Sequence, residues 1–243
     1  MSFKPALVVV DMQEDFCPPV SFAKLCLAGA LANENSGRDI VAIINELLSL
    51  PFTVKVATKD FHPQDHISFA SNHPAPNNKP FVSKATITNP YNPDESQETQ
   101  LWPDHCVQGT KGAELLPELN VSKIDHIIEK GQDRRVEMYS AFADPFKNPR
   151  VTESDLAKTL RDARVTDVFV VGLAADYCVK CTAIDSANEG FNTWVIGEAT
   201  KAVDPSSLEA VHQAYEKVGV SVIDKDAVQV ERVRELAGVA RGE

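Results

Sequence analysis

The sequence predicts an α/β fold in which a mostly parallel, six-stranded sheet lies between two layers of helices. Short apolar runs rich in β-branched residues alternate with longer segments in which apolar residues recur every three or four positions. The short runs are typical of buried parallel strands, and the longer segments are typical of helices that cover a sheet. Because the two kinds of segment alternate, the strands are expected to be parallel, with helices on both faces.

Six segments are predicted to be strands from their apolar or alternating patterns. They are residues 6–10, 52–58, 124–129, 168–173, 192–197 and 221–223. Five segments have the apolar spacing of one helix face. They are residues 37–48, 155–164, 178–188, 206–218 and 228–240.

Two long segments do not fit this alternation. Residues 20–36 have no clean pattern and are predicted to be a long loop or a short insert. Residues 63–105 are rich in Pro, Asn, Ser and His, which predicts a long loop excursion, and such excursions in compact domains are often functional. We expect one domain over residues 1–243, with 228–240 as a C-terminal helix.

The composition is that of an acidic globular protein. Apolar residues make up 43% of the chain, which is enough for a full core, and the net charge is −11. The negative charge argues against nucleic acid or an anionic membrane as a partner and favours a neutral or cationic small molecule. No apolar run has membrane-spanning length, and self-association stays open.

The cysteines and the amino terminus favour a reducing, intracellular compartment. The chain has an odd number of cysteines, at positions 17, 26, 106, 178 and 181. The first residues, MSFKPALVVVD, lack the basic-then-apolar pattern of a secretory signal. We therefore expect free thiols and a cytoplasmic protein, with a nuclear or other intracellular location as the alternative.

Cys178 lies where a predicted strand ends and a predicted helix begins. The unpaired N–H groups of a first helical turn point toward such a side chain, and the helix dipole favours its thiolate. A nucleophile beside an anion-binding cup is what acyl transfer requires. Two other interpretations stay open: a small buried apolar residue, or a redox pair with Cys181 in a C-x-x-C spacing.

Two charged residues follow other predicted strands. Asp11 comes after residues 6–10, at the sheet edge where α/β proteins bind ligands, although a plain turn or helix-cap aspartate is the alternative. Lys130 comes after residues 124–129. If the Lys130 side chain points inward, it would pair with a carboxylate such as that of Asp11; if it points to water, it is unremarkable.

A metal site is a further hypothesis. Asp60 and His62 are two residues apart, so in extended chain their side chains point to the same side. Such a pair is half of a metal site, and His105 would supply a third ligand where the long excursion returns. The alternatives are a chance D-x-H pair and an ordinary loop histidine, which is also how His66 and His73 are interpreted.

Five short motifs occur in the order found in one enzyme family. They are DMQEDF, KDFHP, WPDHCVQGTKGAEL, EKG and GLAADYCV. Together they resemble the nicotinamidase branch of the isochorismatase-like cysteine hydrolases, and the eukaryotic, fungal-like members look closest. The similarity runs from about Phe3 to Asp224, nearly the whole chain. The resemblance implies the three-layer α/β/α sandwich of that superfamily.

The resemblance also implies a role for the candidates at the strand ends. It implies a catalytic triad of Asp11, Lys130 and Cys178. It implies an oxyanion hole from the backbone N–H groups of Ala174 and Cys178, with a cis peptide bond between Leu173 and Ala174.

A metal site and an aromatic pocket are implied in the same way. The metal ligands would be Asp60, His62 and His105, usually for Zn²⁺, with another divalent transition metal as the alternative. Phe16, Trp102 and Tyr139 would surround a pyridine ring, and flat aromatic walls suit such a ring.

The implied activity is hydrolysis of nicotinamide to nicotinate and ammonia in NAD salvage, with pyrazinamide as an expected second substrate. Cys178 would attack the carboxamide carbon, while Asp11 would take the thiol proton and pass it to the leaving ammonia. Lys130 would orient Asp11. Water positioned and acidified by the metal would then hydrolyse the thioester.

The sequence departs from the family pattern in three places. The segment VSFAKLCLA after Pro19 looks like an insertion close to the expected pocket mouth. The additional metal-adjacent acid or histidine of some bacterial members has no clear counterpart, with His66 as a stand-in, and Cys181 is not part of the triad pattern. The alternative functions are another small-amide hydrolase of the carbamoyl-amide type, a C-x-x-C thiol oxidoreductase, and an inactive binding protein.

Overall fold

Six strands form the central sheet. The computed structural model describes residues 2–17 and 37–239. The strands of this sheet are β1 (Pro5–Val10), β2 (Val54–Asp60), β5 (His126–Lys130), β6 (Asp167–Leu173), β7 (Asn192–Lys201) and β8 (Ser221–Ile223). They lie in the order β5-β2-β1-β6-β7-β8, and every pairing is parallel. The order reverses between β1 and β6, which makes the carboxyl ends of these two strands the place where this kind of sheet binds ligands.

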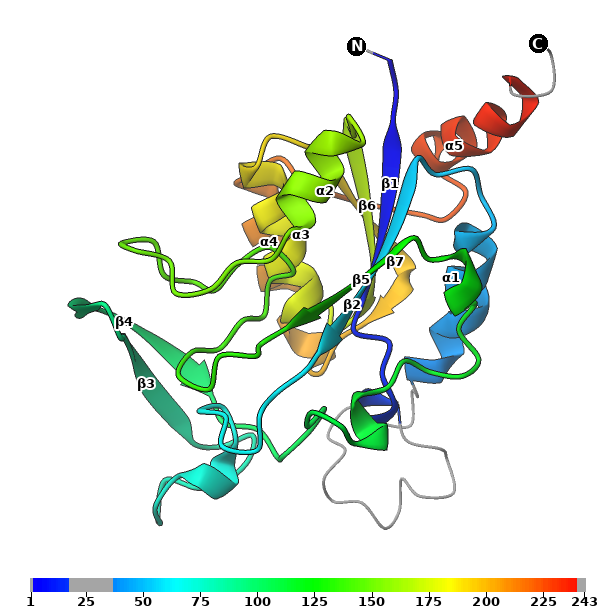
Figure 1. Ribbon diagram of the computed structural model, residues 1–243. Coiled ribbons are helices and arrows are strands. Elements are labelled where there is room, and N and C mark those ends of the chain that lie inside the picture. Colours follow the sequence, from blue (N-terminus) through cyan, green and yellow to red (C-terminus); the bar gives the residue numbers. More distant parts are fainter. Residues whose placement is uncertain (1, 18–36, 240–243) are drawn as a thin grey trace.

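Helices cover both faces of the sheet (Figure 1). One face carries α1 (Val41–Leu48) and α5 (Val228–Val239). The other face carries α2 (Leu156–Asp162), α3 (Cys178–Asn188) and α4 (Leu208–Glu216). The described chain therefore forms the predicted three layers. Single 3-10 turns lie at Glu14–Phe16, Gly37–Ile40, Ala70–Asn72, Lys111–Ala113, Val121–Lys123 and Pro205–Ser207.

The central strands are apolar throughout because both of their faces are covered. Every residue of β1 and β6 is buried. Along β1, Leu7 and Val9 pack in the core under α1 and α5, whereas Val8 and Val10 pack under α2, α3 and α4. Successive side chains of a strand point to opposite faces of the sheet, so alternate residues of β1 pack in two separate cores.

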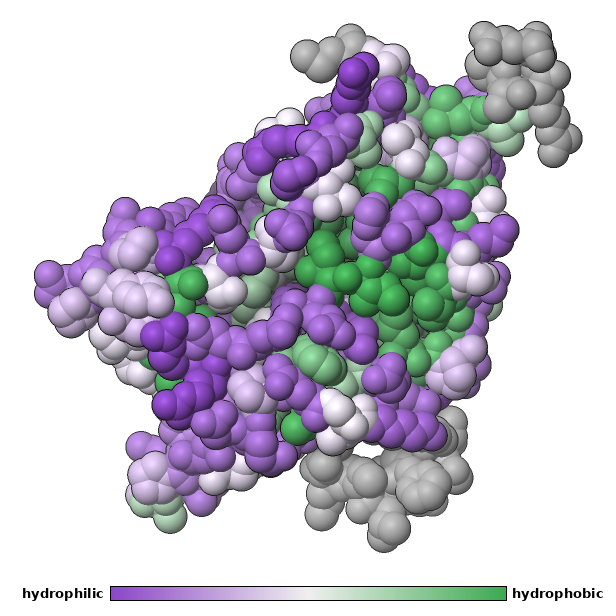
Figure 2. All heavy atoms as spheres, in the orientation of Figure 1, coloured by the Kyte–Doolittle hydropathy of each residue, from purple (hydrophilic) through white to green (hydrophobic). Residues whose placement is uncertain are grey.

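The edge strand β5 is less protected. Its Ile127 is 47% exposed. Figure 2 shows polar residues over most of the face seen there, with hydrophobic residues gathered between β5 and α1. No helix in the described part of the chain is long and apolar enough to cross a membrane.

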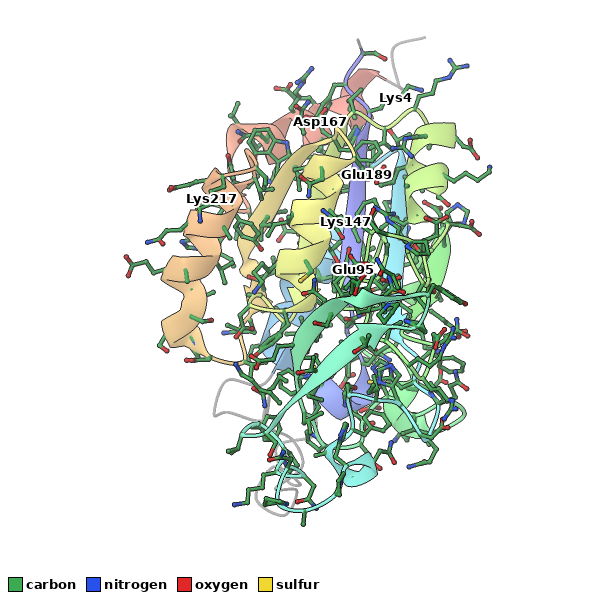
Figure 3. All side chains as sticks on the ribbon, turned by 90° about the vertical axis from the view of Figure 1, so that its left-hand side faces the viewer. Lys4, Glu95, Lys147, Asp167, Glu189 and Lys217 are labelled. Atoms are coloured by element: carbon green, nitrogen blue, oxygen red, sulfur yellow. The ribbon has the colours of Figure 1, made fainter. Side chains whose placement is uncertain are left out.

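A β-hairpin occupies part of the segment that was predicted to be a long loop excursion. The strands β3 (Lys84–Asn89) and β4 (Asn92–Gln100) pair antiparallel and project beside the carboxyl ends of the central strands (Figure 1). The sequence of β4, NPDESQETQ, has no apolar alternation, which is why the pattern did not predict it. Glu95 of β4 accepts hydrogen bonds from the backbone N–H groups of Lys147 and Asn148, and Figure 3 shows Glu95 beside Lys147.

The other predicted elements occur where the sequence pattern put them, with boundaries that move by a few residues. The first helix begins as a 3-10 turn before α1, and β2 extends to Asp60 rather than ending at Thr58. The predicted loop or insert at residues 20–36 lies outside the described residues, as does Cys26.

Candidate active site

Four chemically reactive side chains meet at the carboxyl ends of the central strands. Asp11 directly follows β1, Asp60 and Lys130 are the last residues of β2 and β5, and Cys178 begins α3 after the turn that follows β6. Gly172 in β6 allows this close meeting, because a Cβ there would lie 2.1 Å from the carbonyl oxygen of Val10. Its φ of +109° is a backbone conformation that residues with a side chain rarely adopt.

Asp11, Lys130 and Cys178 form one contact group. Lys130 Nζ lies 3.0 Å from Asp11 Oδ2 and 3.5 Å from Cys178 Sγ. Asp11 is completely buried, Lys130 is 2% exposed and Cys178 is 6% exposed. The structure therefore brings together the three residues expected to form a triad, and Lys130 points inward, as its functional interpretation requires.

The buried environment changes the ionisation of these groups. Burial raises the pKa of Asp11 to about 6, although the Lys130 ammonium opposes this rise. Burial also works against the Lys130 ammonium, but the carboxylates of Asp11 and Asp60 outweigh it and hold the pKa of Lys130 well above its usual value. A carboxyl with a pKa near 6 is mostly ionised at neutral pH and is suited to accept and return a proton there.

The Cys178 thiol differs from the expectation drawn from the helix dipole. Burial raises the pKa of Cys178 well above its usual value, with Lys130 opposing and Asp11 adding to the rise. Burial likewise raises the pKa of Cys181 to about 11. The resting thiol is therefore protonated and needs a base to become a nucleophile, whereas a C-x-x-C redox pair needs a lowered thiol pKa.

The backbone N–H groups of Ala174 and Cys178 are free to bind an anion. Within the described residues, neither group donates a hydrogen bond. Both residues line the pocket next to the Cys178 side chain. The peptide bond between Leu173 and Ala174 is cis, as expected from the family resemblance.

Asp60, His62 and His105 form a second cluster beside the first. Asp60 Oδ2 lies 3.7 Å from His62 Nε2 and 4.0 Å from His105 Nε2. The other ring nitrogens face backbone carbonyl oxygens, with His62 Nδ1 2.8 Å from Gly131 O and His105 Nδ1 2.7 Å from Pro103 O. These contacts favour a proton on Nδ1, so each Nε2 presents a lone pair toward Asp60.

A metal ion fits this cluster. His62 Nε2 is buried without a hydrogen-bond partner in the described part of the chain. The three ligand atoms lie within 4.8 Å of one another. Two imidazoles and one carboxylate are a donor set that zinc prefers, and three protein ligands leave coordination positions open. Asp60 Oδ1 is held by Lys130 Nζ at 2.5 Å, so one lysine joins the two clusters.

His66 and His73 are engaged elsewhere. The His66 ring stacks on His62 with centroids 4.1 Å apart, but its nitrogens face Ser68 Oγ and the Val136 carbonyl oxygen. His73 Nε2 faces the Ile67 carbonyl oxygen. His66 therefore supports the His62 ring and, as oriented, offers no free nitrogen to a metal.

An aromatic pocket opens over Cys178 and the metal cluster. The three residues predicted from the resemblance, Phe16, Trp102 and Tyr139, all line it. Trp102 Nε1 donates a hydrogen bond of 2.9 Å to the Tyr139 hydroxyl, which also lies 3.1 Å from Thr99 Oγ1. These bonds join the β4 side of the pocket to the loop after β5.

Sequence reasoning missed six residues that line the pocket. They are Asp15, Phe81, Pro103, Glu137, Tyr177 and Val203. The Trp102 and Tyr177 rings meet edge to face with centroids 4.8 Å apart, and Phe81 meets Trp102 at 5.6 Å. The position of Tyr177 directly before Cys178 was a usable signal, whereas Phe81 lies in a segment without periodicity.

Comparison with known proteins agrees with this geometry. The family model for the isochorismatase domain matches residues 5–227. The chain belongs to the isochorismatase family. It is 40% identical over 226 residues to a nicotinamidase of Acinetobacter baylyi, covering 93% of this chain and 94% of that protein.

Two solved structures relate this isochorismatase-family protein to enzymes of known name. The yeast nicotinamidase structure superposes with a TM-score of 0.78 at 33% identity, covering 91% of this chain and 100% of that one. A pyrazinamidase of Pyrococcus horikoshii in complex with zinc superposes with a TM-score of 0.64 at 31% identity, covering 91% and 99%.

Proposed function

We propose that this isochorismatase-family protein is a nicotinamidase, an amidohydrolase that converts nicotinamide to nicotinate and ammonia. The observation that carries the proposal is the contact group of Asp11, Lys130 and Cys178, of which Cys178 lines an aromatic pocket. The similarity over nearly the whole chain to a nicotinamidase supports the substrate. Pyrazinamide, which replaces the pyridine ring by a pyrazine ring, is the expected second substrate.

The first half of the reaction uses the triad. Asp11 takes the proton from the Cys178 thiol, and the sulfur forms a bond to the carboxamide carbon of the substrate. Lys130 keeps Asp11 in place and balances its charge. The oxygen of the tetrahedral intermediate is held by the N–H groups of Ala174 and Cys178, a contribution of roughly 3–4 kcal/mol per donor in comparable sites. The protonated Asp11 then gives its proton to the leaving nitrogen, so that ammonia departs and a thioester stays.

The second half reverses these roles. Asp11 accepts a proton from water as the water oxygen attacks the thioester carbon. The carbon–sulfur bond breaks, and the proton returns from Asp11 to Cys178 while nicotinate leaves. The pKa of Asp11 near 6 suits both transfers, because the carboxyl is mostly ionised at neutral pH and is still basic enough to take a proton.

Asp60, His62 and His105 are the residues that would hold a divalent cation, and zinc suits their donor atoms. A cation bound there supplies Lewis acidity, which polarises a water molecule or a ring nitrogen. His66 and the carbonyl oxygen of Gly131 fix the His62 ring for this task. Gly131 must lack a side chain, because a Cβ there would lie 2.4 Å from His62 Cε1.

The aromatic walls suit a flat, neutral ring. Phe16, Trp102 and Tyr139 surround the space above the Cys178 sulfur. Burial raises the pKa of the Tyr139 phenol well above its usual value, so the hydroxyl stays neutral and keeps its bonds to Trp102 and Thr99. These three aromatic side chains therefore offer apolar contact without an added charge.

Ammonia release from nicotinamide tests the proposal. The zinc-loaded wild-type protein is expected to turn over, and Cys178→Ala is expected to lose about 10⁴-fold or more of that activity. Cys181→Ala is the matched control, since Cys181 does not line the pocket, and it should retain activity within about twofold.

Three outcomes would overturn the proposal in different ways. Normal turnover by Cys178→Ala would reject the nucleophile. No ammonia release by the wild type, together with thiol–disulfide exchange that is lost in Cys181→Ala, would favour the thiol oxidoreductase. No turnover of nicotinamide by the wild type, with turnover of a carbamoyl amide, would favour the other small-amide hydrolase.

A further inference from the structure

A hydroxyl on β2 holds the carboxylate that follows β1. Thr58 Oγ1 donates a hydrogen bond of 2.6 Å to Asp11 Oδ1 and accepts one of 3.2 Å from the Asp11 backbone N–H. Both residues are completely buried. Asp11 has a φ of +49°, a left-handed conformation that costs a residue with a side chain free energy. The Thr58 hydroxyl therefore fixes both the strained backbone and one carboxylate oxygen.

An amide after β1 holds the carboxylate-bearing residue of β2 in return. Gln13 Nε2 donates a hydrogen bond of 2.8 Å to the Asp60 carbonyl oxygen, and Gln13 Oε1 accepts one of 2.8 Å from the Asp60 backbone N–H. Gln13 is completely buried and also donates to the Ala113 carbonyl oxygen at 3.0 Å. The Gln13 side-chain amide thus makes the two hydrogen bonds to the Asp60 backbone that the backbone of a neighbouring strand would make.

The two arrangements are reciprocal. The backbone ladder between β1 and β2 ends at the pair Val9 and Ala57, and side chains make the cross-strand bonds beyond it. Asp11 and Gln13 are two residues apart, as are Thr58 and Asp60, so each strand supplies one carboxylate and one residue that holds the carboxylate of the other strand. Both carboxylates contact the same Lys130 ammonium.

We propose that Thr58 and Gln13 are positioning residues that form a cross-strand clamp, in which Thr58 leaves Asp11 Oδ2 as the proton acceptor for Cys178. This inference rests on the proposed function, because it assigns Asp11 the role of base. Asp11 Oδ1 is occupied by the Thr58 hydroxyl, while Oδ2 accepts no hydrogen bond in the described residues and lies 3.0 Å from Lys130 Nζ. Gln13 has the corresponding task of holding Asp60 in register for the metal cluster.

The role of Thr58, which is one of the two arms of the clamp, can be tested by a reaction that needs only the base Asp11 and the sulfur of Cys178. Iodoacetamide is a small neutral amide, and its reaction with Cys178 forms a sulfur–carbon bond while iodide leaves. The thiol proton passes to Asp11 Oδ2. Since this reaction requires neither nicotinamide nor a metal, its rate depends directly on how Asp11 is positioned.

The experiment compares Thr58→Val with Thr58→Ser and with Thr86→Val, an exposed threonine on β3 that serves as the matched control. Thr58→Val is expected to slow Cys178 alkylation and kcat together by about ten- to a hundredfold, the effect of one hydrogen bond to a charged group. KM should change by less than about twofold, because Thr58 does not line the pocket. Thr58→Ser keeps the hydroxyl and should restore both rates.

The role of Gln13, the other arm of the clamp, is tested by the zinc affinity of the protein, measured by competition with a coloured chelator. Gln13→Leu is expected to weaken zinc binding about ten- to a hundredfold, as loss of a residue that supports a ligand does. Thr58→Val should leave zinc affinity within about twofold. The two variants therefore separate the two arms of the clamp.

Unchanged alkylation in folded Thr58→Val would overturn the Thr58 assignment, and unchanged zinc affinity in Gln13→Leu would overturn the Gln13 assignment. If Thr58→Val does not fold, Thr58→Ala carries the same test. A wild-type protein that alkylates at Cys178 and depends on Thr58, yet does not hydrolyse nicotinamide, would keep the clamp and reject the proposed substrate.

Discussion

The site has two halves, and they differ in whether their buried polar atoms find partners within the described chain. The triad half consists of Asp11, Lys130 and Cys178, and its buried charges are balanced within the chain by the ion pair at 3.0 Å. The metal half consists of Asp60, His62 and His105, and it leaves His62 Nε2 buried without a partner in the described residues. One half is complete from the chain alone, whereas we propose that a bound cation completes the other.

The comparison shows why a single lysine is central. Lys130 Nζ contacts both Asp11 and Asp60, so the buried ammonium is shared by the two halves. Although burial raises it, the pKa of Asp60 is held far below its usual range by Lys130 and His62. Asp60 therefore stays a carboxylate, while Asp11 is left with a pKa near 6. The same environment prepares one carboxyl to bind a cation and the other to exchange a proton.

Removing the shared ammonium should break both halves and have the largest effect. Lys130→Met leaves two buried carboxylates without their cation, and loss of one partner of a buried ion pair costs about 3–5 kcal/mol of stability. Hydrolysis should fall about 10²–10⁴-fold. Urea unfolding and ammonia release measure the two effects. Lys84→Met, at an exposed lysine of β3, is the matched control and should change neither.

Metal removal should separate the halves. After chelation we expect loss of hydrolysis, while alkylation of Cys178 by iodoacetamide continues within about threefold, because the triad is balanced without the metal. The melting temperature should fall by several degrees, since a bound ligand stabilises the folded state by roughly 3 kcal/mol at a hundredfold excess over its Kd. Added zinc should restore both. Equal loss of alkylation and hydrolysis would show that the halves are not separable.

The sequence predicted that Asp11 and Cys178 lie at the same sheet edge because both residues follow buried, apolar strands. The runs at Ala6–Val10 and Val168–Val171 identify central strands, and side chains that follow parallel strands meet at one edge. The sequence could not predict how these side chains are oriented relative to one another. Whether Lys130 pointed inward and which oxygen of Asp11 stayed free depend on contacts such as that with Thr58, 47 residues from Asp11.

The surroundings of the site were harder to predict because they lie in segments without periodicity. Within the hairpin, β4 has no apolar alternation and β3 has only Ala85 and Ile87 on its apolar face, which is too short a pattern to predict a strand. Phe81 reaches the pocket because the excursion folds back over the sheet edge, and Glu137 reaches it from the loop after β5. The dipole of α3 predicted a thiolate at Cys178, but burial outweighs the dipole and raises the thiol pKa.

The pH dependence of alkylation should show that the triad half works without the metal. In chelated protein, the rate should fall about tenfold for each unit of pH below 6, because Asp11, with its pKa raised to about 6 by burial, becomes protonated and can no longer accept the thiol proton. The fold should persist through this range. The folded protein binds the Asp11 proton more tightly than the unfolded chain does, so protonation at Asp11 does not favour unfolding. An acid limb near pH 4, typical of an ordinary carboxyl, would contradict this assignment.

The pocket wall belongs to neither half, so changing it should have the smallest effect and a different signature. Tyr139→Phe removes the hydroxyl that accepts the Trp102 Nε1–H bond and contacts Thr99, and one such bond contributes about 0.5–1.5 kcal/mol. We expect KM for nicotinamide to rise about three- to tenfold while kcat stays within about twofold, because the wall holds the ring in the ground state and the transition state alike. Tyr91→Phe, at a tyrosine that is 57% exposed beside the hairpin turn, is the matched control. A fall in kcat at unchanged KM would mean that Tyr139 acts on the reacting atoms, and the division of the site into two halves and a wall would then be wrong.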